Sequence, residues 1–310
     1  MDKARVLLVV GLCLLVVGIA PAAGSAPAPA RRDVVDGAGR LVRVPVSASR
    51  IISLAPSVTE ILFALGFGDR VVGVTDFCDY PPAAATRARI GGIINQDLER
   101  IVSLSPDLAL ATMSGNLRDD AERLERLGIP VYTIGTPTVT SILATLRTVG
   151  DLLGAPQPAA ALAKALEARL DAVRSASSAR RRPRTLYVIE PDPLIAPGGG
   201  TFLGEALAIA GADLVTSDSR SGWAQYDIEQ VIGWKPEVIL TPEANREWAR
   251  RVPGMDRWRG VPAVAAGRIF VISDAIQHPG PRMVDGIEEV ARLLARSIDV
   301  RGDVGGEGTP

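Results

Sequence analysis

The sequence predicts an α/β protein with two Rossmann-like lobes, each built on a parallel sheet, and one long helix between them. Strand-like and helix-like segments alternate along the chain, which is typical of parallel sheets covered by helices. One helix–strand unit occurs twice, at residues 97–110 and 227–240, and this repetition indicates two related lobes. Residues 156–180, between the two copies, are rich in strong helix formers and predict the connecting helix.

The N-terminus has the pattern of a secretory signal peptide. Lys3 and Arg5 precede an unbroken apolar run at 6–20, and small residues and prolines follow as far as Ala26. The apolar run, about 15 residues long, is shorter than the roughly 20 residues that span a bilayer. We therefore expect residues 1–26 to be cleaved and the mature chain to be exported to the periplasm.

The overall composition narrows the class of protein. The chain has 310 residues, with 34 lysines and arginines against 35 aspartates and glutamates, and one histidine. A nucleic-acid-binding protein would need a basic face, so no nucleic acid partner is expected. Cys13 lies within the apolar run of the signal peptide. Cys78 is therefore the one cysteine of the mature chain, which cannot form an internal disulfide.

The first part of the mature chain predicts a hairpin. Residues 27–48 are expected to form a tether followed by this hairpin, because two β-prone runs within Val34–Pro45 flank a glycine-containing turn. The first α/β lobe is expected at residues 49–155. Its further strands are predicted at 71–74, 108–111 and 131–134, with a helix at 117–127.

The first strand and helix of this lobe have clear boundaries. Arg50–Leu54 predicts a buried strand, and a helix is expected to begin at Pro56 and to stop at Gly66. Ser57 and Glu60 have the spacing of a capping box, in which each side chain would bond a free N–H at the start of the helix.

The repeated unit has the same order of residue types in both copies. Each has an acidic residue, an apolar residue, glutamate, a polar residue and two β-branched residues, and then proline, an acidic residue and a strand. A following strand also matches, at 128–134 and 267–272. Two matches in the same order argue for duplicated lobes, the second at residues 181–299 with a terminal helix. Residues 300–310 are expected to be a disordered tail.

The connecting helix is predicted to be a rod between the lobes. Leu162, Leu166, Leu170 and Val173 recur at helical spacing on one face. About 20 residues at 1.5 Å each give roughly 30 Å, enough to run from one lobe to the other. A single rigid helix between the lobes suggests limited hinge motion.

Three segments carry a family resemblance. Ser53–Glu60 (SLAPSVTE), Thr75–Pro82 (TDFCDYPP) and Leu98–Val102 (LERIV), the last followed by Pro-Asp-Leu, resemble the helical-backbone, or class III, substrate-binding proteins of ABC importers. Within that family the chain is most similar to the cobalamin-binding branch. The likeness runs from about Arg50 to Leu294. It implies a monomer that holds cobalamin or a related corrinoid between its lobes as cargo, with no intrinsic cofactor, and delivers it to a permease dimer with its ATPase subunits.

The resemblance also implies residue roles. Loops at the strand ends would line the cleft, as is usual for open α/β sheets. Glu99 and Glu229 would form ion pairs with arginines of the permease, and both occupy the same position of the repeat, so a two-fold importer could meet one on each side. The implied ligand contacts are Pro56, Ser57, Phe77, Cys78, Tyr80, Ile93, Thr112 and Met113 in the first lobe and Pro197, Gly198, Trp223, Asp274 and His278 in the second.

The chain departs from the family pattern in its cleft residues. The cobalamin branch closes its cleft with several tryptophans, but here Trp223 alone lies at such a place, with Ile93 and Thr112 or Met113 at the others. His278 stands in place of an arginine, and the disulfide of the second lobe has no counterpart. Apolar side chains could still cover a corrin ring, because burial of apolar surface contributes about 25 cal/mol per Å².

Two other functions are alternatives to corrinoid binding. An iron-siderophore or haem protein could use the same scaffold, with arginines such as Arg220 or Arg246, or a tyrosine, in the cleft. An enzyme is disfavoured, because Ser57 lacks the flanking glycines of a nucleophile elbow and one histidine with one cysteine cannot form a typical zinc site. Metal coordination by Cys78 or His278 stays open. The glycines that follow Pro197 are interpreted as a loop that lets a bulky ligand approach the backbone.

Overall fold

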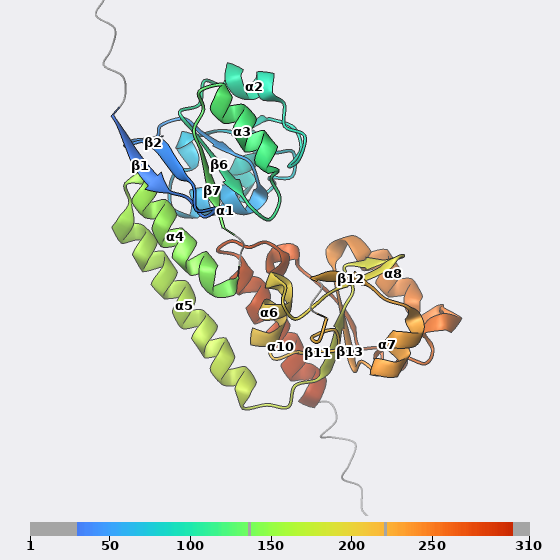
Figure 1. Ribbon diagram of the computed structural model, residues 1–310. Helices are drawn as coiled ribbons and strands as arrows, with labels where there is room; N and C mark the ends of the chain where they lie inside the picture. The colour runs from blue at the N-terminus through green and yellow to red at the C-terminus, as the bar shows by residue number, and fades with distance from the viewer. Residues whose placement is uncertain (1–29, 136–137, 220–221, 300–310) are drawn as a thin grey trace, which may run out of the picture.

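The computed structural model describes residues 30–135, 138–219 and 222–299. The predicted signal peptide at 1–26 and the predicted tail at 300–310 lie outside these residues. Figure 1 shows two lobes, one above the other, with long helices along one side. No helix in the described parts of the chain is long and apolar enough to cross a membrane.

The first lobe is built on a parallel sheet of five strands in the order β5-β4-β3-β6-β7. The first strand of the sheet, β3, therefore lies in the middle, and the connections reverse direction between β3 and β6. The predicted strands are confirmed and β5 is additional. The bounds are β3 (Ile51–Ser53), β4 (Val71–Val74), β5 (Ala88–Arg89), β6 (Leu108–Thr112) and β7 (Val131–Ile134).

Hairpin and helices complete this lobe. The predicted hairpin is present as β1 (Arg31–Val35) paired antiparallel with β2 (Leu41–Pro45). The helices are α1 (Pro56–Ala64), α2 (Leu98–Ser103) and α3 (Arg118–Arg126), with short 3-10 turns η1 (Gly68–Arg70) and η2 (Pro82–Thr86). The capping box predicted for α1 is wrong. Ala55 caps the helix without a side-chain bond, Pro56 occupies the first turn, and the Glu60 carboxylate bonds Arg282 instead.

The second lobe is built on a parallel sheet of four strands in the order β11-β8-β13-β14. A small antiparallel sheet, β12-β10-β9, stands beside it and was not predicted. The strand bounds are β8 (Arg184–Tyr187), β9 (Glu190–Pro191), β10 (Leu194–Pro197), β11 (Asp213–Leu214), β12 (Trp223–Gln225), β13 (Val238–Pro242) and β14 (Ile269–Ile272).

The helices of the second lobe cover both faces of its parallel sheet (Figure 1). They are α6 (Phe202–Ile209), α7 (Ile228–Trp234), α8 (Arg246–Arg251), α9 (Pro262–Ala265) and the terminal α10 (Met283–Asp299). The 3-10 turns are η3 (Glu243–Asn245), η4 (Val252–Gly254), η5 (Asp256–Trp258) and η6 (Asp274–Gln277).

The two copies of the repeat have the same backbone conformation. In each copy the ninth residue, Ser105 in one and Lys235 in the other, has a left-handed φ, of 48° and 52°. A non-glycine residue rarely adopts this conformation, so its recurrence at one repeat position is specific. A proline follows in both copies and directs the chain from the short helix into β6 or β13.

The same side-chain contacts brace both copies. Arg50 donates from Nε to the carbonyl of Leu104 at 3.1 Å, and Arg184 donates from Nε to the carbonyl of Trp234 at 2.8 Å. The acidic residue of each copy then accepts the backbone N–H of the same arginine: Asp107 from Arg50, and the Glu237 carboxylate from Arg184. The duplication predicted from the sequence is therefore present in three dimensions.

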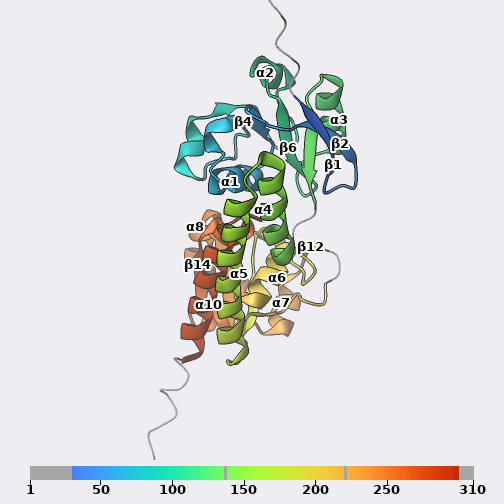
Figure 2. The ribbon, with the colours of Figure 1, turned by 90° about the vertical axis from the view of Figure 1, so that its left-hand side faces the viewer.

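Two antiparallel helices, α4 (Val139–Leu153) and α5 (Pro156–Ser178), connect the lobes (Figure 2). The long helix was predicted, and its 23 residues span about 35 Å. The role of α4 was not predicted. It begins against the second lobe, where the Val139 N–H donates to Glu205 at 2.8 Å, and ends against the first, where Arg70 donates to the Leu153 carbonyl at 3.2 Å.

The hydrophobic core is continuous through this helical pair. One cluster of buried residues includes Leu62 of α1, Leu146 of α4, Leu170 of α5, Leu207 of α6 and Ile287 of α10. Because the same apolar cluster joins both lobes, a large rotation between them would expose part of it to water. This arrangement agrees with the limited hinge motion that the sequence suggested.

Candidate ligand cleft

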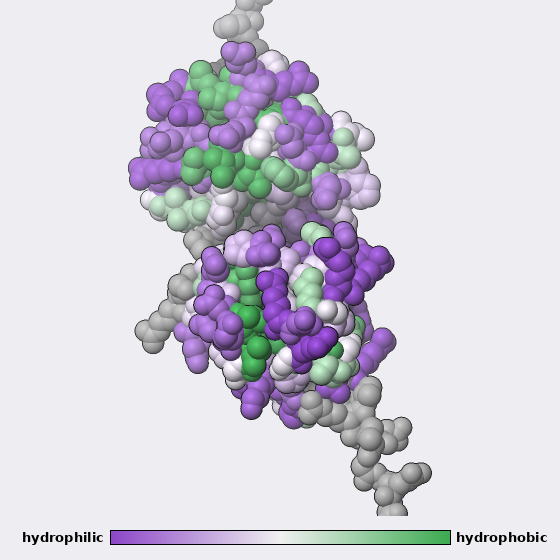
Figure 3. Space-filling view, turned by 90° about the vertical axis from the view of Figure 1, so that its right-hand side faces the viewer, coloured by the Kyte–Doolittle hydropathy of each residue, from purple (hydrophilic) through white to green (hydrophobic). Residues whose placement is uncertain are grey.

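Both parallel sheets direct their carboxyl ends toward the junction of the lobes. The chain leaves β7 in the first lobe and, within a few residues, begins α4 at Glu205 of the second lobe. It enters β8 only after α5 has run the length of the second lobe (Figure 1). Loops at such ends are the usual ligand-binding positions of open α/β sheets. Figure 3 shows the surface hollowed between the two lobes.

The innermost part of the junction is nearly closed. Ser57, Ile61, Thr112 and Pro279 are among the residues around a cavity of about 10 Å³, which is room for about one water molecule. Ser57 and Thr112 are both buried. A larger ligand would therefore have to lie further out, between the loops. Ser57 and Thr112 could contact only the innermost part of such a ligand.

Asn116 ties three cleft loops of the first lobe together. Its carboxamide donates to the carbonyls of Leu54, at 2.8 Å, and Ile93, at 2.9 Å, and accepts the N–H of Thr112 at 2.9 Å. Leu54 follows β3, Ile93 comes after β5, and Thr112 is the last residue of β6, so the three groups belong to the carboxyl ends of three different strands. The sequence prediction missed Asn116, although an asparagine a few residues after a buried strand is a signal that could have found it.

Asn245 has the corresponding role in the second lobe. Its carboxamide donates to the carbonyl of Ile189 at 3.0 Å and to the Thr241 hydroxyl at 3.0 Å, while that hydroxyl donates to the Val188 carbonyl at 2.8 Å. Leu54 and Val188 each follow the first parallel strand of their lobe, β3 and β8. One asparagine per lobe therefore organises the sheet edge where the strand order reverses.

The loop after β4, residues 75–82, has an inner and an outer side. Arg89 donates from Nη1 to the carbonyls of Thr75, at 2.8 Å, and Cys78, at 2.9 Å, and fixes the loop from behind. Phe77 and Tyr80 point outward, with 60% and 43% of their surfaces exposed. They are two of the predicted ligand contacts, and their exposure leaves them accessible.

Cys78 lies on the inner side of the same loop. It is fully buried, and its Sγ lies 3.1 Å from the hydroxyls of Thr59 and Thr75. This thiol packs within the first lobe and supports the loop, which argues against the predicted ligand contact at Cys78. A buried cysteine that acts as a small apolar residue is the commoner situation.

Apolar side chains are exposed at the remaining first-lobe loops. Met113, directly after β6, is 50% exposed, and Ile93 is half-buried with the exposed Ile94 beside it. Gly115 lies against the Ile93 side chain, so a Cβ at Gly115 would crowd it. Together with Phe77, these residues form an apolar edge on the first lobe.

The glycine loop of the second lobe has a different role from the predicted one. A Cβ at Gly198 or Gly199 would overlap the backbone of residues 217–219, so both glycines allow the chain to pack against itself. Pro197 and Gly198 are buried. This packing argues against an approach of the ligand to the loop backbone, and the ligand contacts at these two residues stay predictions. Pro197 instead pairs with Trp223 across β10 and β12, and the Trp223 side chain is 51% exposed.

His278 and Asp274 follow β14. The His278 Nδ1 lies 3.5 Å from Oε1 of Glu60, across the lobe junction, and burial and the nearby Arg282 lower its pKa. The ring is therefore neutral near pH 7. Asp274 accepts a bond from Gln277 at 3.0 Å. The structure thus directs Nδ1 of His278 toward Glu60 of the first lobe. A ligand contact of this ring would therefore use its other side, which carries Nε2.

The two predicted docking residues lie at equivalent surface positions. Glu99 is in the first turn of α2 and Glu229 in the first turn of α7, and both are exposed. In the described part of the chain, no group of three or more histidine, cysteine, aspartate or glutamate side chains could hold a metal ion. Of the cleft arginines considered, Arg246 is exposed and paired with Glu243, and Arg220 lies outside the described residues.

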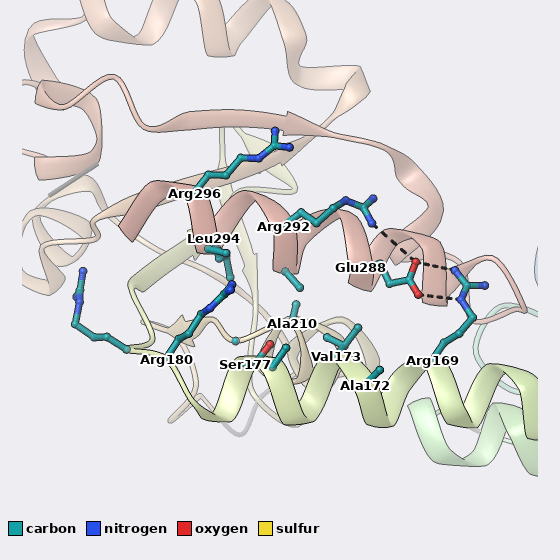
Figure 4. A pocket seen from close by; sticks show the side chains of 15 residues that line it. Arg169, Ala172, Val173, Ser177, Arg180, Ala210, Glu288, Arg292, Leu294 and Arg296 are labelled. Atoms are coloured by element: carbon teal, nitrogen blue, oxygen red, sulfur yellow. Dashed lines mark hydrogen bonds and ion pairs between the residues drawn. The ribbon is translucent and has the colours of Figure 1, made fainter. Parts of the chain in front are cut away.

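A larger groove lies away from the cleft, between α5 and α10 (Figure 4). It has a volume of about 500 Å³ and a floor of small side chains such as Ala172, Val173 and Ala210. Figure 4 shows Arg169 and Arg292 both paired with Glu288, while Arg296 is directed away from α5. A carboxylate of the chain itself thus occupies the point where two arginines meet, so this groove lacks the geometry of an anion site.

Comparisons with known proteins agree with the two-lobed cleft. Residues 51–275 match the family model described as periplasmic binding protein. The chain belongs to the periplasmic binding protein family. This membership fits its parallel sheets and connecting helix, which are those of the class III fold, and establishes an exported, substrate-binding role in ABC transport.

Individual relatives are similar over most of their length. The vitamin B12-binding protein of Vibrio cholerae is 30% identical over 259 residues, which cover 82% of this chain and 92% of the relative. An uncharacterised ABC transporter substrate-binding lipoprotein of Bacillus subtilis is 30% identical over 268 residues, 84% of each chain.

Two solved structures carry the comparison to three dimensions. The crystal structure of the periplasmic vitamin B12-binding protein of Vibrio cholerae matches with a TM-score of 0.72 and 29% identity, covering 82% of this chain and 99% of that one. The periplasmic heme-binding protein of Roseiflexus sp. RS-1 matches with a TM-score of 0.74 and 25% identity, covering 81% and 99%. The family shares one architecture for ligands of different chemistry.

Proposed function

We propose that this protein binds cobalamin or a related corrinoid in the cleft between its lobes and delivers it to an ABC permease. The main support is the exposed apolar side chains of both lobes: Phe77 and Met113 on loops of the first lobe and Trp223 on β12 of the second are each at least half exposed, and the first lobe adds the half-buried Ile93. A corrin ring is broad and apolar with a polar amide fringe. Similarity to the vitamin B12-binding protein of Vibrio cholerae supports the same ligand class.

Delivery is proposed to use Glu99 and Glu229. Each glutamate lies in the first turn of a short exposed helix, and the two helices are the copies of one repeat. One surface carboxylate per lobe suits a permease built of two like halves, because each half can contact one lobe. The ligand is cargo and is released unchanged.

Calorimetry tests the ligand class. Purified mature protein is titrated with cyanocobalamin, cobinamide, haemin and a ferric siderophore. We expect saturable binding of the corrinoids at one per chain and recovery of the ligand unchanged. Binding of haemin alone, or turnover of the ligand, would overturn the proposal.

Two variants assign the binding to the cleft. Phe77→Ala and Trp223→Ala should each weaken corrinoid binding, because each removes an aromatic surface from one wall. The matched control is Leu127→Ala, which truncates an equally exposed side chain, 53% exposed, at the opposite edge of the first-lobe sheet. Equal affinity of all three variants would place the ligand elsewhere.

Haem is the second candidate ligand. It is favoured by one observation, the partly exposed phenol of Tyr80 on the loop after β4, together with the similarity to a heme-binding protein. Against it, the Tyr80 ring lies beneath the Arg282 guanidinium, 4.6 Å from the ring centre. A haem complex that used Tyr80 would lose its characteristic visible absorption in Tyr80→Phe.

A further inference from the structure

Glu60 is a carboxylate buried between the lobes. It lies on α1 of the first lobe, with 2% of its side chain exposed, and its Oε1 accepts a bond from Nε of Arg282 at 2.7 Å. Arg282 immediately precedes α10 of the second lobe. The carboxylate and the guanidinium therefore form an ion pair across the junction, next to the helix α5 that connects the lobes.

Among the described residues, the second oxygen of this carboxylate has no hydrogen-bond partner. Oε2 of Glu60 is buried and packs against Gly280, where a Cβ would lie only 3.1 Å from it. An unpartnered carboxylate oxygen is costly to bury, because it loses its bonds to water. Arg282 alone therefore compensates the burial, and it does so for one of the two oxygens.

Arg282 connects this ion pair to a cleft loop. Its guanidinium stacks on the Tyr80 ring at 4.6 Å from the ring centre, a distance at which cations and aromatic faces attract each other. Tyr80 belongs to the loop after β4, which also carries Phe77. Arg282 thus contacts Glu60 across the lobe junction and Tyr80 on a predicted ligand-binding loop. A change in the spacing of the lobes would therefore also move this loop.

We propose that Glu60 and Arg282 are positioning residues for ligand capture, which together set how tightly the two lobes are held and where the Tyr80 loop lies. The inference rests on the proposed capture of a ligand in the cleft, but its first test needs no ligand. Neither residue has to touch the ligand to act in this way.

Several charged groups surround Glu60. Arg282 and the neutral His278 face it from the second lobe, Asp79 lies on the loop beside Tyr80, and Asp274 acts on His278. From α5 and α10, Arg169 and Asp285 line the cavity that Glu60 also borders. Burial raises the pKa of Glu60 to about 7, and the charge and bond of Arg282 oppose this increase.

The direction of the pH effect follows from this raised pKa. An ordinary glutamate has a pKa of 4.5, so between pH 4.5 and 7 the packed interface binds a proton more readily than an opened one. Closure of the lobes is therefore strongest below pH 4.5 and weakens as the pH rises toward 7, above which it changes no further. Higher pH thus loosens the junction.

Distances between spin labels in ligand-free protein test this inference. Val102 and Ile232 occupy the same position in the two copies of the repeat and are exposed, so Val102→Cys with Ile232→Cys reports the spacing of the lobes, while the buried Cys78 stays unlabelled. The population with widely spaced lobes should increase by more than tenfold from pH 5 to pH 8, because the pKa of Glu60 is about 7 in the packed arrangement and 4.5 in the opened one.

Variants separate the inference from general destabilisation. In Glu60→Gln, a neutral isostere, the spacing should be narrow and independent of pH. In Arg282→Met the population with widely spaced lobes should exceed that of the wild type at pH 8, because the Glu60 carboxylate is then unpaired. At pH 5 the two populations should be similar. Spacing that is independent of pH in the wild type, or the same pH dependence in Glu60→Gln, would overturn the inference.

Glu288→Gln is the matched control. Glu288 is paired with Arg169 between α5 and α10, and this pairing lowers its pKa, so its contribution is lost only as the pH falls below the usual range of a carboxylate. The wide population should have the wild-type pH dependence in this variant. A second measurement, cyanocobalamin affinity at pH 5 and pH 8, should be less pH-dependent in Glu60→Gln than in the wild type. If cyanocobalamin does not bind at all, the proposed function fails. The spin-label distances in ligand-free protein still test the role of Glu60 and Arg282 in that case.

Discussion

Asn116 illustrates how much one polar side chain contributes to the candidate cleft. It satisfies the Leu54 carbonyl and the Thr112 N–H, and it shares the Ile93 carbonyl with the carboxamide of Gln96. Leaving such groups unpaired costs about 1–3 kcal/mol. The loops that carry Ile93 and Met113 are therefore held by contacts that no apolar residue could replace.

We expect Asn116→Ala to lower the free energy of unfolding by about 1–3 kcal/mol and to weaken corrinoid binding, because Ile93 and Met113 lose their fixed position. Asn116→Asp, which keeps the acceptor for Thr112 but places a carboxylate oxygen against both carbonyls, should be at least as destabilising. Denaturant unfolding and calorimetry measure the two quantities. Asn95→Ala, at an exposed asparagine nearby, is the control, and an equal loss of affinity in it would contradict the positioning role.

Cys78 gives the opposite lesson at the same scale. Sequence placed it in a cleft loop and allowed a ligand contact, whereas its thiol points into the first lobe toward Thr59 and Thr75. We expect Cys78→Ser to bind corrinoid like the wild type, with no change in the visible spectrum of the complex. A spectral change of the bound corrinoid in this variant would indicate that the thiol reaches the ligand.

At the scale of elements, the pairing of α4 with α5 decides the spacing of the lobes. Gly150 of α4 packs so closely against Ala159 of α5 that an added Cβ would overlap the Ala159 Cβ. The predicted long helix is present, but its partner α4 was missed. Its length and its contacts with both lobes depend on packing that no local pattern specifies.

Gly150→Ala should push the two helices apart and destabilise the protein by about 1–3 kcal/mol, in spite of the higher helix propensity of alanine. Thermal and denaturant unfolding measure the change. Ala144→Ser adds one atom at an exposed position of the same helix and should change stability by no more than about 0.5 kcal/mol. A stabilised Gly150→Ala protein would show that the helices can separate without cost.

At the scale of the whole molecule, the duplication places Glu99 and Glu229 on equivalent helices of the two lobes. Each carboxylate is exposed, so neither contributes to the core or to the cleft. An importer that reads both would therefore depend on the spacing of the lobes as well as on the charges. This dependence links docking to the Glu60–Arg282 contact at the junction.

Charge reversal tests this docking. Glu99→Arg and Glu229→Arg should each reduce stimulation of the ATPase of the reconstituted importer, and the double variant should abolish it, because the permease arginines would then be repelled. Calorimetric affinity for the ligand should stay unchanged. Glu247→Arg, at an exposed glutamate of α8, is the control. Full stimulation by the double variant would exclude these residues from docking.

Local and repeating patterns in the sequence determined the hairpin, four of the five strands of the first sheet, the duplicated unit and the long helix, because alternation, proline stops and helical spacing act within a few residues. Phe77 could be assigned to the loop after a strand in the same way. The tertiary structure alone decided which loop residues face outward, since burial of Cys78, Pro197 and Gly198 depends on distant segments that pack against them. It alone also brought Glu60 to Arg282, residues more than two hundred positions apart, whose ion pair forms only after both lobes have folded.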